Sequence, residues 1–296
     1  MTKALLIVNP SSGNEAAETY APRVKEQLQK TYEQVEVVFT KGEGDATRFA
    51  REAAKSHTTA VFAMGGDGTV NETVTGLAEQ PFRPDFSFIP FGTVNDLARS
   101  LGISLNPEEA VEQLANLTPQ KLDVGKVNDS YFIDVVAIGA IPTAVQDVSV
   151  EQKTRLGSLA YFLEGAKALT ERKSYQFNLE IDDEKIEVES ILLLVALTNS
   201  VAGFEKLVAD ATPDDGKLNL IVLKEKDLLT IIKLLPKLLT GDITKEPDIL
   251  YRSFEKGEIL VENEGNLIAN IDGDPGDSLP LRIQVLPNHL TILVPK

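Results

Sequence analysis

Residues 59–74 read TAVFAMGGDGTVNETV, a strand, a turn and the start of a helix in sixteen residues. The apolar run 60–64 predicts a buried strand, and residues 70–74 can begin a helix. Glycines in the turn permit positive φ and let backbone N–H groups approach phosphate oxygens. Asp67 would repel a phosphate unless a cation lay between them, so the stretch indicates a metal–nucleotide site. An ordinary Gly-Asp-Gly turn is the alternative.

Other common site motifs are missing from the sequence. Asn71 stands where the dinucleotide fingerprint G-x-G-x-x-G needs glycine, and G-x-x-x-x-G-K-[ST] does not occur. The nucleophile motif G-x-S-x-G and the zinc motif H-E-x-x-H are also absent. The two histidines, His57 and His289, lie far apart in polar contexts, which favours surface positions.

The composition of the chain excludes several kinds of partner and site. The 296 residues suggest about two domains, and 45 acidic against 29 basic residues give a net charge of −16. This charge argues against a nucleic-acid partner, because phosphate backbones need basic surfaces. The chain has no cysteine, which removes disulfides, zinc–thiolate sites and thiol nucleophiles.

No transmembrane segment is expected. The first apolar run breaks at Asn9-Pro10, too early for a signal peptide, and the longest aliphatic run, Ile191–Leu197, has the length of a strand. We therefore expect a cytoplasmic protein. Residues 228–239 are apolar nearly all round with two lysines, which suits either a helix packed on a sheet or a contact with lipid.

The first third alternates strand and helix patterns. Helices are predicted around 17–28 and 46–54, and strands at Ala4–Val8, Val35–Phe39, Val61–Met64 and Phe86–Pro90. Such alternation predicts a parallel sheet covered by helices, in which ligands bind at the carboxyl ends of the strands. Four polar, glycine-bearing segments fall at those ends: Asn9–Gly13, Thr40–Gly42, Gly65–Asn71 and Gly92–Asp96.

Beyond about residue 125 strands dominate, apart from a helix predicted over 153–170. Strands are expected at 131–138, 175–181, 185–200, 218–223, 251–261, 267–271, 281–285 and 290–294. We therefore predict two domains: an α/β nucleotide-binding domain with a parallel sheet at 1–125, and an antiparallel β-sandwich for the lipid or substrate at 126–296. The C-terminal strand can return to the first domain.

Two motifs in this order, Gly65–Thr69 with Asn71-Glu72 and Phe91–Arg99, resemble the diacylglycerol kinase catalytic family. The likeness is to bacterial soluble lipid kinases of the diacylglycerol kinase B type, and it covers nearly the whole chain. Supporting segments are Asn9–Gly13, Leu122–Gly125, Pro213–Leu218 and Ile271–Asp274. NAD kinases and phosphofructokinases carry turns similar to the first motif alone.

The resemblance implies a site for ATP and Mg²⁺ in the cleft between the two domains. The positions that match the ATP site are Asn9, Pro10, Ser11, Ser12, Gly13, Thr40, Gly65, Gly66, Asp67, Gly68, Thr69, Val70, Asn71 and Thr93. Acidic positions of the magnesium and water network match Asp67, Asp96 and Asp123. A structural magnesium site matches Asp215, with backbone carbonyls near Thr212 and Lys217 as further ligands; from the residues alone this is a hairpin turn.

Asp272 and Asp274 are the candidate catalytic carboxylates. Extended backbone would place both on one face, and Pro275 biases Asp274 toward that geometry. A carboxylate that accepts the proton of a lipid hydroxyl assists phosphoryl transfer. The family usually has Asp-Gly-Glu here with the Glu as proton acceptor, so Asp274 is one methylene shorter. Without the resemblance, this stretch is an acidic surface turn.

The resemblance implies an ATP- and Mg²⁺-dependent phosphotransferase that acts on a hydroxyl of diacylglycerol or a related neutral lipid. The enzyme would meet this substrate peripherally, at the membrane surface, and a homodimer is compatible with the chain. The alternatives are an NAD kinase-like small-molecule kinase, against which Gly92–Asp96 argues, and a nucleotide-binding regulator that has lost catalysis, which the Asp274 departure keeps open. Arg155, Lys167, Arg172 and Lys173 are candidates for a basic patch facing lipid.

Overall fold

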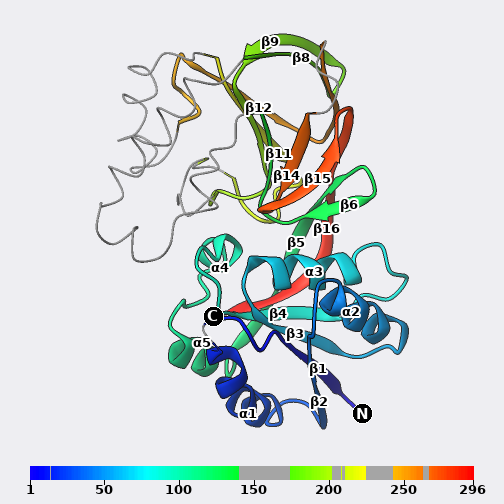
Figure 1. Ribbon diagram of the computed structural model, residues 1–296. Helices are drawn as coiled ribbons and strands as arrows, with labels where there is room; N and C mark the ends of the chain where they lie inside the picture. The colour runs from blue at the N-terminus through cyan, green and yellow to red at the C-terminus, as the bar shows by residue number, and fades with distance from the viewer. Residues whose placement is uncertain (14, 140–173, 202–207, 209–210, 225–242, 263–266) are drawn as a thin grey trace.

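The computed structural model describes residues 1–13, 15–139, 174–201, 208, 211–224, 243–262 and 267–296 (Figure 1). The helix predicted over 153–170, the candidate basic patch and the apolar segment 228–239 lie outside the described residues. In the part of the chain that is described, no helix is both long and apolar enough to span a bilayer.

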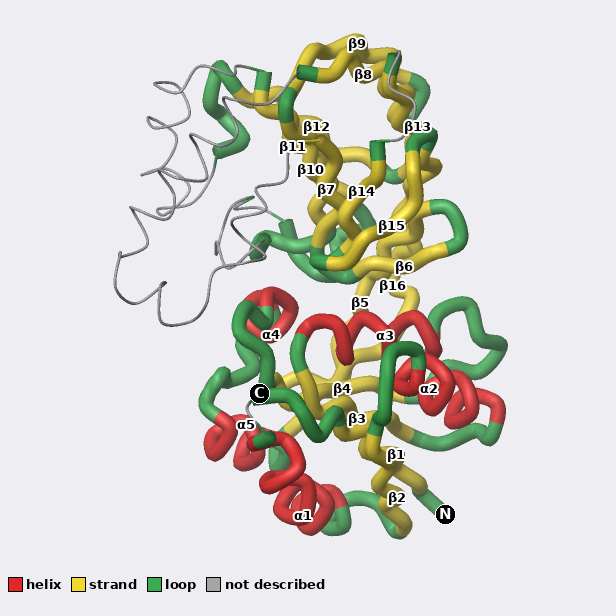
Figure 2. The backbone as a smooth tube through the Cα atoms, viewed as in Figure 1, coloured by secondary structure: helices red, strands yellow, loops and turns green. Residues whose placement is uncertain are grey.

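The N-terminal domain is a parallel sheet between two layers of helices (Figure 2). Its strands lie in the order β2-β1-β3-β4, all parallel. The elements are β1 Lys3–Val8, α1 Ala16–Leu28, β2 Gln34–Phe39, α2 Asp45–Lys55, β3 Ala60–Gly65, α3 Asp67–Leu77, β4 Asp85–Pro90, α4 Asp96–Ser100 and α5 Pro107–Gln113. Helices α1 and α5 pack on one face of the sheet, and α2 and α3 on the other. The predicted α/β domain is confirmed.

Local sequence explains these layers. Every residue of β3 is buried, as its unbroken apolar run predicts. The alanine face of α2 lies against α3, where Gly76 allows the two helices to approach closely. A Cβ on Gly76 would lie 2.4 Å from the carbonyl oxygen of Thr47, so no larger residue fits there.

The C-terminal domain is an antiparallel sandwich, which confirms the second predicted class. One sheet has the order β12-β11-β10-β7-β14-β15, and the facing layer is formed by β16, β13, β8 and β9 with β5 and β6. The strands are β5 Leu117–Val127, β6 Ser130–Phe132, β7 Val135–Gly139, β8 Tyr175–Ile181, β9 Glu184–Ser190, β10 Leu192–Ala196, β11 Leu218–Leu223, β12 Ile249–Phe254, β13 Lys256–Val261, β14 Ile268–Ile271, β15 Asp274–Ser278 and β16 Leu281–Pro295.

Strand β16 connects the two domains. It pairs in parallel with β4 at Ile292 and Phe86, and antiparallel with β5 and β13, so one ten-stranded sheet runs through both. Two separate strands were predicted here; the structure has one, with an irregularity between Leu286 and Leu290. Both chain ends lie in the N-terminal domain (Figure 1). Strand β5 was not predicted, and the division at residue 125 stays a prediction.

Three predicted strands are wrong in the same way. Residues 131–138, 185–200 and 251–261 each break into two strands that belong to different sheets. A side chain holds each corner: the Asp272 carboxylate at 133–135, the Ser190 hydroxyl before β10, and the Asp182 carboxylate at 255–256. At 131–138 the apolar run continues through the corner, interrupted only by Asp134, so the pattern alone does not reveal the break there.

Candidate active site

Loops from neighbouring strands meet at the carboxyl edge of the parallel sheet. Asn9 follows β1, and its amide Nδ2 donates to the Thr69 hydroxyl at the start of α3, at 3.1 Å. The Asn9 carbonyl Oδ1 accepts from both the backbone N–H and the hydroxyl of Ser11, at 3.2 and 2.9 Å. The loop after β1 is thereby tied to the Gly65–Thr69 turn, although 60 residues separate Asn9 from Thr69.

Two glycine turns face each other beside this loop. A Cβ on Gly92 would lie 2.8 Å from the Cα of Gly66, so the turns after β3 and β4 approach with backbone against backbone. Asn95 holds the second turn: its side chain accepts from the Gly92 N–H and donates to the Gly92 carbonyl. The left-handed φ of 53° at Asn95 suits asparagine better than most residues.

Asp67 is the first residue of α3, and its side chain connects the turn after β3 to the turn after β4. Its two carboxylate oxygens accept the backbone N–H groups of Asn95 and Asp96, at 2.9 and 3.2 Å. Burial raises the pKa of the Asp67 carboxyl, and the neighbouring Asp96 adds to that rise. A cation placed beside Asp67 would relieve this penalty.

The glycines of the first turn and their neighbours can be tested separately. Gly68 is exposed, has no positive φ and has nothing within 4 Å of an added Cβ, so Gly68→Ala should leave the midpoint of urea unfolding unchanged or slightly higher. The methyl group would obstruct a bound phosphate, so ATP affinity should fall by about tenfold or more. Gly92→Ala, in contrast, should destabilise the fold, because the Gly66 backbone cannot give way. Equal ATP affinity in Gly68→Ala and wild type would contradict a phosphate site at this turn.

Asn71 joins the two domains. Its Nδ2 donates to the Asp272 carboxylate at 2.7 Å and to the Tyr131 carbonyl at 3.2 Å. The Asp272 carboxylate also accepts three consecutive backbone N–H groups, from Ile133, Asp134 and Val135, at 2.7, 3.0 and 2.8 Å. Asp272 therefore holds the corner between β6 and β7 against α3.

The extended backbone expected at Asp272–Asp274 is wrong. Asp272 and Gly273 both have positive φ, 48° and 99°, and they form the two-residue turn between β14 and β15. Gly273 adopts this φ without strain, and its N–H donates to the Asn270 side chain. Asp272 consequently turns into the domain junction, whereas Asp274 is exposed at the start of β15.

Asp134 is a buried acid that the sequence reasoning missed. It is 4% exposed, and its Oδ1 has no hydrogen-bond partner among the described residues. Burial raises the pKa of Asp134 well above its usual range, and Asp272, Asp96 and Asp67 raise it further. The sequence feature that could have revealed Asp134 is its position as the single carboxylate inside the apolar run Phe132–Ile138.

Asp272 itself gives a pH-dependence. Burial raises its pKa to about 6, despite the four hydrogen bonds that favour the ionised form. Since an unfolded Asp titrates near ~3.9, the native state binds more protons between pH 4 and 6, and the stabilisation from Asp272 declines as pH rises through this window. Asn does not titrate, so the Asp272→Asn variant lacks this decline. As the pH rises from 4 to 7, the free energy of unfolding of Asp272→Asn should therefore shift upward relative to that of wild type by about 2 kcal/mol in urea unfolding. A pH-independent difference would contradict the raised pKa.

The predicted acidic network divides into two groups. Asp96 accepts the Ser200 hydroxyl at 2.5 Å and lies near Asp67. Asp123 instead accepts the N–H groups of Gly216 and Asn288, both at 2.6 Å, and fixes the 214–217 turn to β5 and β16. Burial raises the pKa of the Asp123 carboxyl, with a contribution from Asp215.

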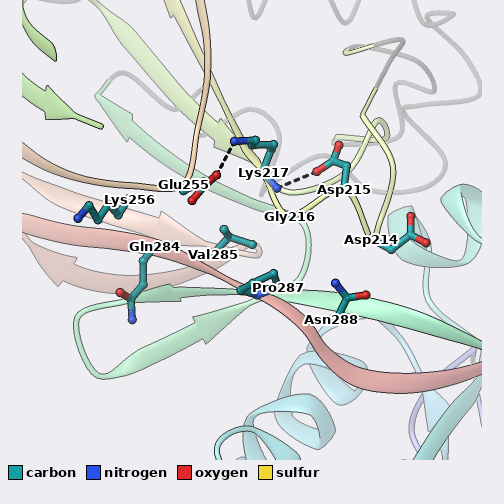
Figure 3. Close-up of a pocket in the computed structure, with 10 residues that line it drawn as sticks. All are labelled: Asp214, Asp215, Gly216, Lys217, Glu255, Lys256, Gln284, Val285, Pro287 and Asn288. Atoms are coloured by element: carbon teal, nitrogen blue, oxygen red, sulfur yellow. Dashed lines mark hydrogen bonds and ion pairs between the residues drawn. The ribbon is translucent and has the colours of Figure 1, made fainter. Parts of the chain in front are cut away.

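The proposed structural-metal turn lines a cavity of about 400 Å³ (Figure 3). The Asp215 carboxylate accepts the backbone N–H groups of Thr212 and Lys217, at 3.0 and 2.8 Å, and the Lys217 ammonium pairs with Glu255 at 2.6 Å. The turn is thus closed by its own hydrogen bonds, and Asp215 keeps further lone pairs for a cation. Among the described residues, no three acidic or histidine side chains are grouped closely enough to hold a metal on their own.

The remaining predicted ATP positions lie in the segments after β1, β2 and β4 and in α3. Thr40 is half-buried after β2, Thr93 is exposed in the turn after β4, and Val70 is buried in α3. Pro10, Ser12 and Gly13 lie in the loop between β1 and α1, where Gly13 has a φ of 63°. Asp274 and the turn at Asp215 lie on the other domain.

Comparison with known proteins identifies the family. The family model described as "Diacylglycerol kinase catalytic domain" matches residues 3–127. The chain belongs to this family, because diacylglycerol kinases that are 35–36% identical match it over 99–100% of its length. Residues 134–294 match the model described as "YegS C-terminal NAD kinase beta sandwich-like domain".

Similar members of the diacylglycerol kinase catalytic domain family span the whole chain. A diacylglycerol kinase of Bacillus subtilis (strain 168) is 36% identical over 300 residues, covering 100% of this chain and 97% of the relative. One from Staphylococcus epidermidis is 35% identical over 294 residues, covering 99% and 92%. The crystal structure of a diacylglycerol kinase from Bacillus anthracis str. Sterne superposes with a TM-score of 0.82 at 29% identity, covering 99% and 96%. The predicted class, a phosphotransferase with an alcohol acceptor, is confirmed.

Proposed function

We propose that the protein transfers the γ-phosphoryl group of ATP to a hydroxyl of diacylglycerol or a related neutral lipid, with Mg²⁺ as the cofactor. The hydrogen bond between Asn71 and Asp272 carries this proposal. It joins the helix that follows the glycine turn to the turn before Asp274, across 201 residues of sequence. A donor site at the first and an acceptor site at the second would then be adjacent, as phosphoryl transfer requires.

In this proposal the N-terminal domain binds the donor. Backbone N–H groups of Gly65–Thr69 and the N-terminus of α3 would hold the phosphates. Asn9 and Asn95 act as positioning residues, because their side chains fix the loops around the turn. The triphosphate would lie along the carboxyl edge of the sheet, with its γ-phosphate toward the second domain.

Magnesium would bind between the phosphates and Asp67, with Asp96 nearby. Mg²⁺ prefers one or two carboxylates together with phosphate oxygens and water, so the half-buried Asp67 and its raised pKa suit such an ion. When bound, it would neutralise the charge on the transferred group. We also propose a structural cation at Asp215, held with backbone carbonyls of Thr212 and Lys217.

The C-terminal domain would supply the proton acceptor. Asp274 is exposed, and among the described residues its carboxylate has no hydrogen-bond partner. Its oxygens are therefore available to accept the proton of the lipid hydroxyl. Asp272, with four donors on its carboxylate, would position the turn that carries Asp274.

A direct assay tests the proposal. The protein is incubated with γ-labelled ATP and Mg²⁺ in mixed micelles that contain diacylglycerol, phosphatidylglycerol, ceramide or undecaprenol, and in a parallel tube with NAD. We expect label in the lipid phase with diacylglycerol, and its loss on addition of EDTA. Label in NAD alone would support the small-molecule kinase alternative, and ATP binding without transfer to any acceptor would support a regulator.

Fractionation of cells would test whether the protein is cytoplasmic and meets the membrane peripherally. Light scattering would test whether it forms a homodimer.

A further inference from the structure

The order of the strands in the sheet indicates which way the bound nucleotide would lie along the carboxyl edge. The glycine turns follow β3 and β4, and β4 pairs with β16, which continues into the C-terminal domain. In the proposed function the γ-phosphate lies on that side, toward Asp272 and Asp274. The base must then point the opposite way along the carboxyl edge, past β1 toward the edge strand β2. The distance from β4 to β2 is three strand spacings, about 14 Å, which a nucleoside triphosphate can span.

An exposed aromatic residue lies at that end. Phe39 is the last residue of β2, and its side chain is 41% exposed. Every other Phe and Tyr among the described residues is buried or half-buried. It pairs in register with Val8, the residue directly before Asn9. The next residue, Thr40, is held by a hydrogen bond from its N–H to the Val8 carbonyl at 2.9 Å.

The Phe39 side chain lies on the face that the β1–α1 loop covers. Side chains alternate along a strand, and Val35 and Val37 pack on the α1 side whereas Val38 packs on the α2 side. Phe39 shares the parity of Val37 and so lies on the α1 side. The loop Asn9–Gly13, which enters α1, leaves the sheet on the same face.

The surface beyond Phe39 is open. Added Cβ atoms on Gly42 and Gly44 would meet nothing within 4 Å, and residues 41–44 are exposed. A planar ring could rest on Phe39 here.

We propose that Phe39 is the platform on which the purine base of the nucleotide donor stacks. This assignment rests on the proposed donor site and names the residue that binds the base. Stacking of a base on an aromatic side chain changes binding by about 5- to 150-fold on removal of the ring. An exposed phenylalanine, otherwise unfavourable in contact with water, thereby gains a partner.

A single substitution gives a local reporter. The sequence contains no tryptophan, so Phe39→Trp introduces the only one, and its fluorescence reports on this position alone. We expect Mg²⁺–ATP to quench the emission in a saturable way, and Mg²⁺–tripolyphosphate, which has the phosphates without the base, to leave it unchanged. An equal response to both, or no response to ATP while the protein phosphorylates lipid, would overturn the proposal.

Kinetics provide the second measurement. Phe39→Leu, which keeps the apolar volume without the aromatic face, should raise KM for ATP about tenfold, with KM for lipid and the urea midpoint unchanged. Phe39→Tyr should behave as wild type. Leu105→Ala removes another exposed apolar side chain of the same domain, at 38% exposure, and should change neither constant. An unchanged KM for ATP in Phe39→Leu would contradict base stacking.

The outcomes also separate this inference from the proposed function. Quenching of Phe39→Trp by ATP without phosphorylation of any lipid would support the base site and defeat the lipid kinase assignment. Lipid phosphorylation with no effect of Phe39 substitutions would support the kinase and place the base elsewhere.

Discussion

Asp274→Asn should lower the rate of lipid phosphorylation by about a hundredfold or more, with ATP affinity and stability unchanged. A general base in a transferred-proton step contributes about 10²- to 10⁴-fold, and asparagine keeps the shape of aspartate while losing the ability to accept a proton. Because Asp274 is exposed and starts β15, its substitution leaves the packing of the sandwich intact. The measurement is kcat in the mixed-micelle assay, beside ATP binding by calorimetry.

Asp277→Asn is the matched control. It lies on the same strand, is also exposed, and accepts a hydrogen bond from Asn128 at 2.9 Å that an amide oxygen can still accept. Its kcat should equal that of wild type. Asp274→Glu restores the residue that the family usually carries, and it should keep or raise the rate. If Asp274→Asn phosphorylates lipid at the wild-type rate, Asp274 is not the base.

Asp272→Ala should destabilise the protein by about 3 kcal/mol, the largest effect on stability expected from a single change at the site. The substitution removes the acceptor for the backbone N–H groups of Ile133, Asp134 and Val135 and for the Asn71 amide. Each buried donor left without a partner costs about 1–3 kcal/mol, and water entering the space offsets part of the total. Urea unfolding at pH 7 measures the change.

Asp274→Ala is the control for this prediction, because it shortens the neighbouring exposed acid and should leave the unfolding midpoint unchanged. Asn71→Ala removes one of the four donors and should cost less than Asp272→Ala. Equal stability of Asp272→Ala and wild type would mean that the corner between β6 and β7 holds without its carboxylate.

Local patterns were sufficient for the N-terminal domain. The buried run of β3, the alanine face of α2 and the glycines after β3 depend on neighbours within a few residues, so their structure could be predicted from sequence. In a parallel sheet the carboxyl ends of the strands lie at one edge, where ligands bind, so the meeting of the four strand-end segments could also be predicted. The family resemblance rested on the same short segments.

Corners and shared strands could not be predicted in this way. The run at residues 132–138 is apolar on both sides of Asp134, and this one carboxylate does not show that β6 and β7 join different sheets. The bonds that fix this corner come from Asp272, more than 130 residues later. The continuity of β16 depends on its pairing with β5, which runs along most of its length.

The two domain classes, the turn at Gly65–Thr69 and the family could be predicted from the sequence, because they depend on short segments whose conformation is set by nearby residues. The roles of neighbouring carboxylates depend on contacts that form only in the folded chain. Asp272 and Asp274 are two residues apart, yet one accepts four hydrogen bonds at the domain junction and the other is exposed. The difference arises from positive φ at Asp272 and Gly273 and from partners 137–201 residues away, which no local pattern encodes.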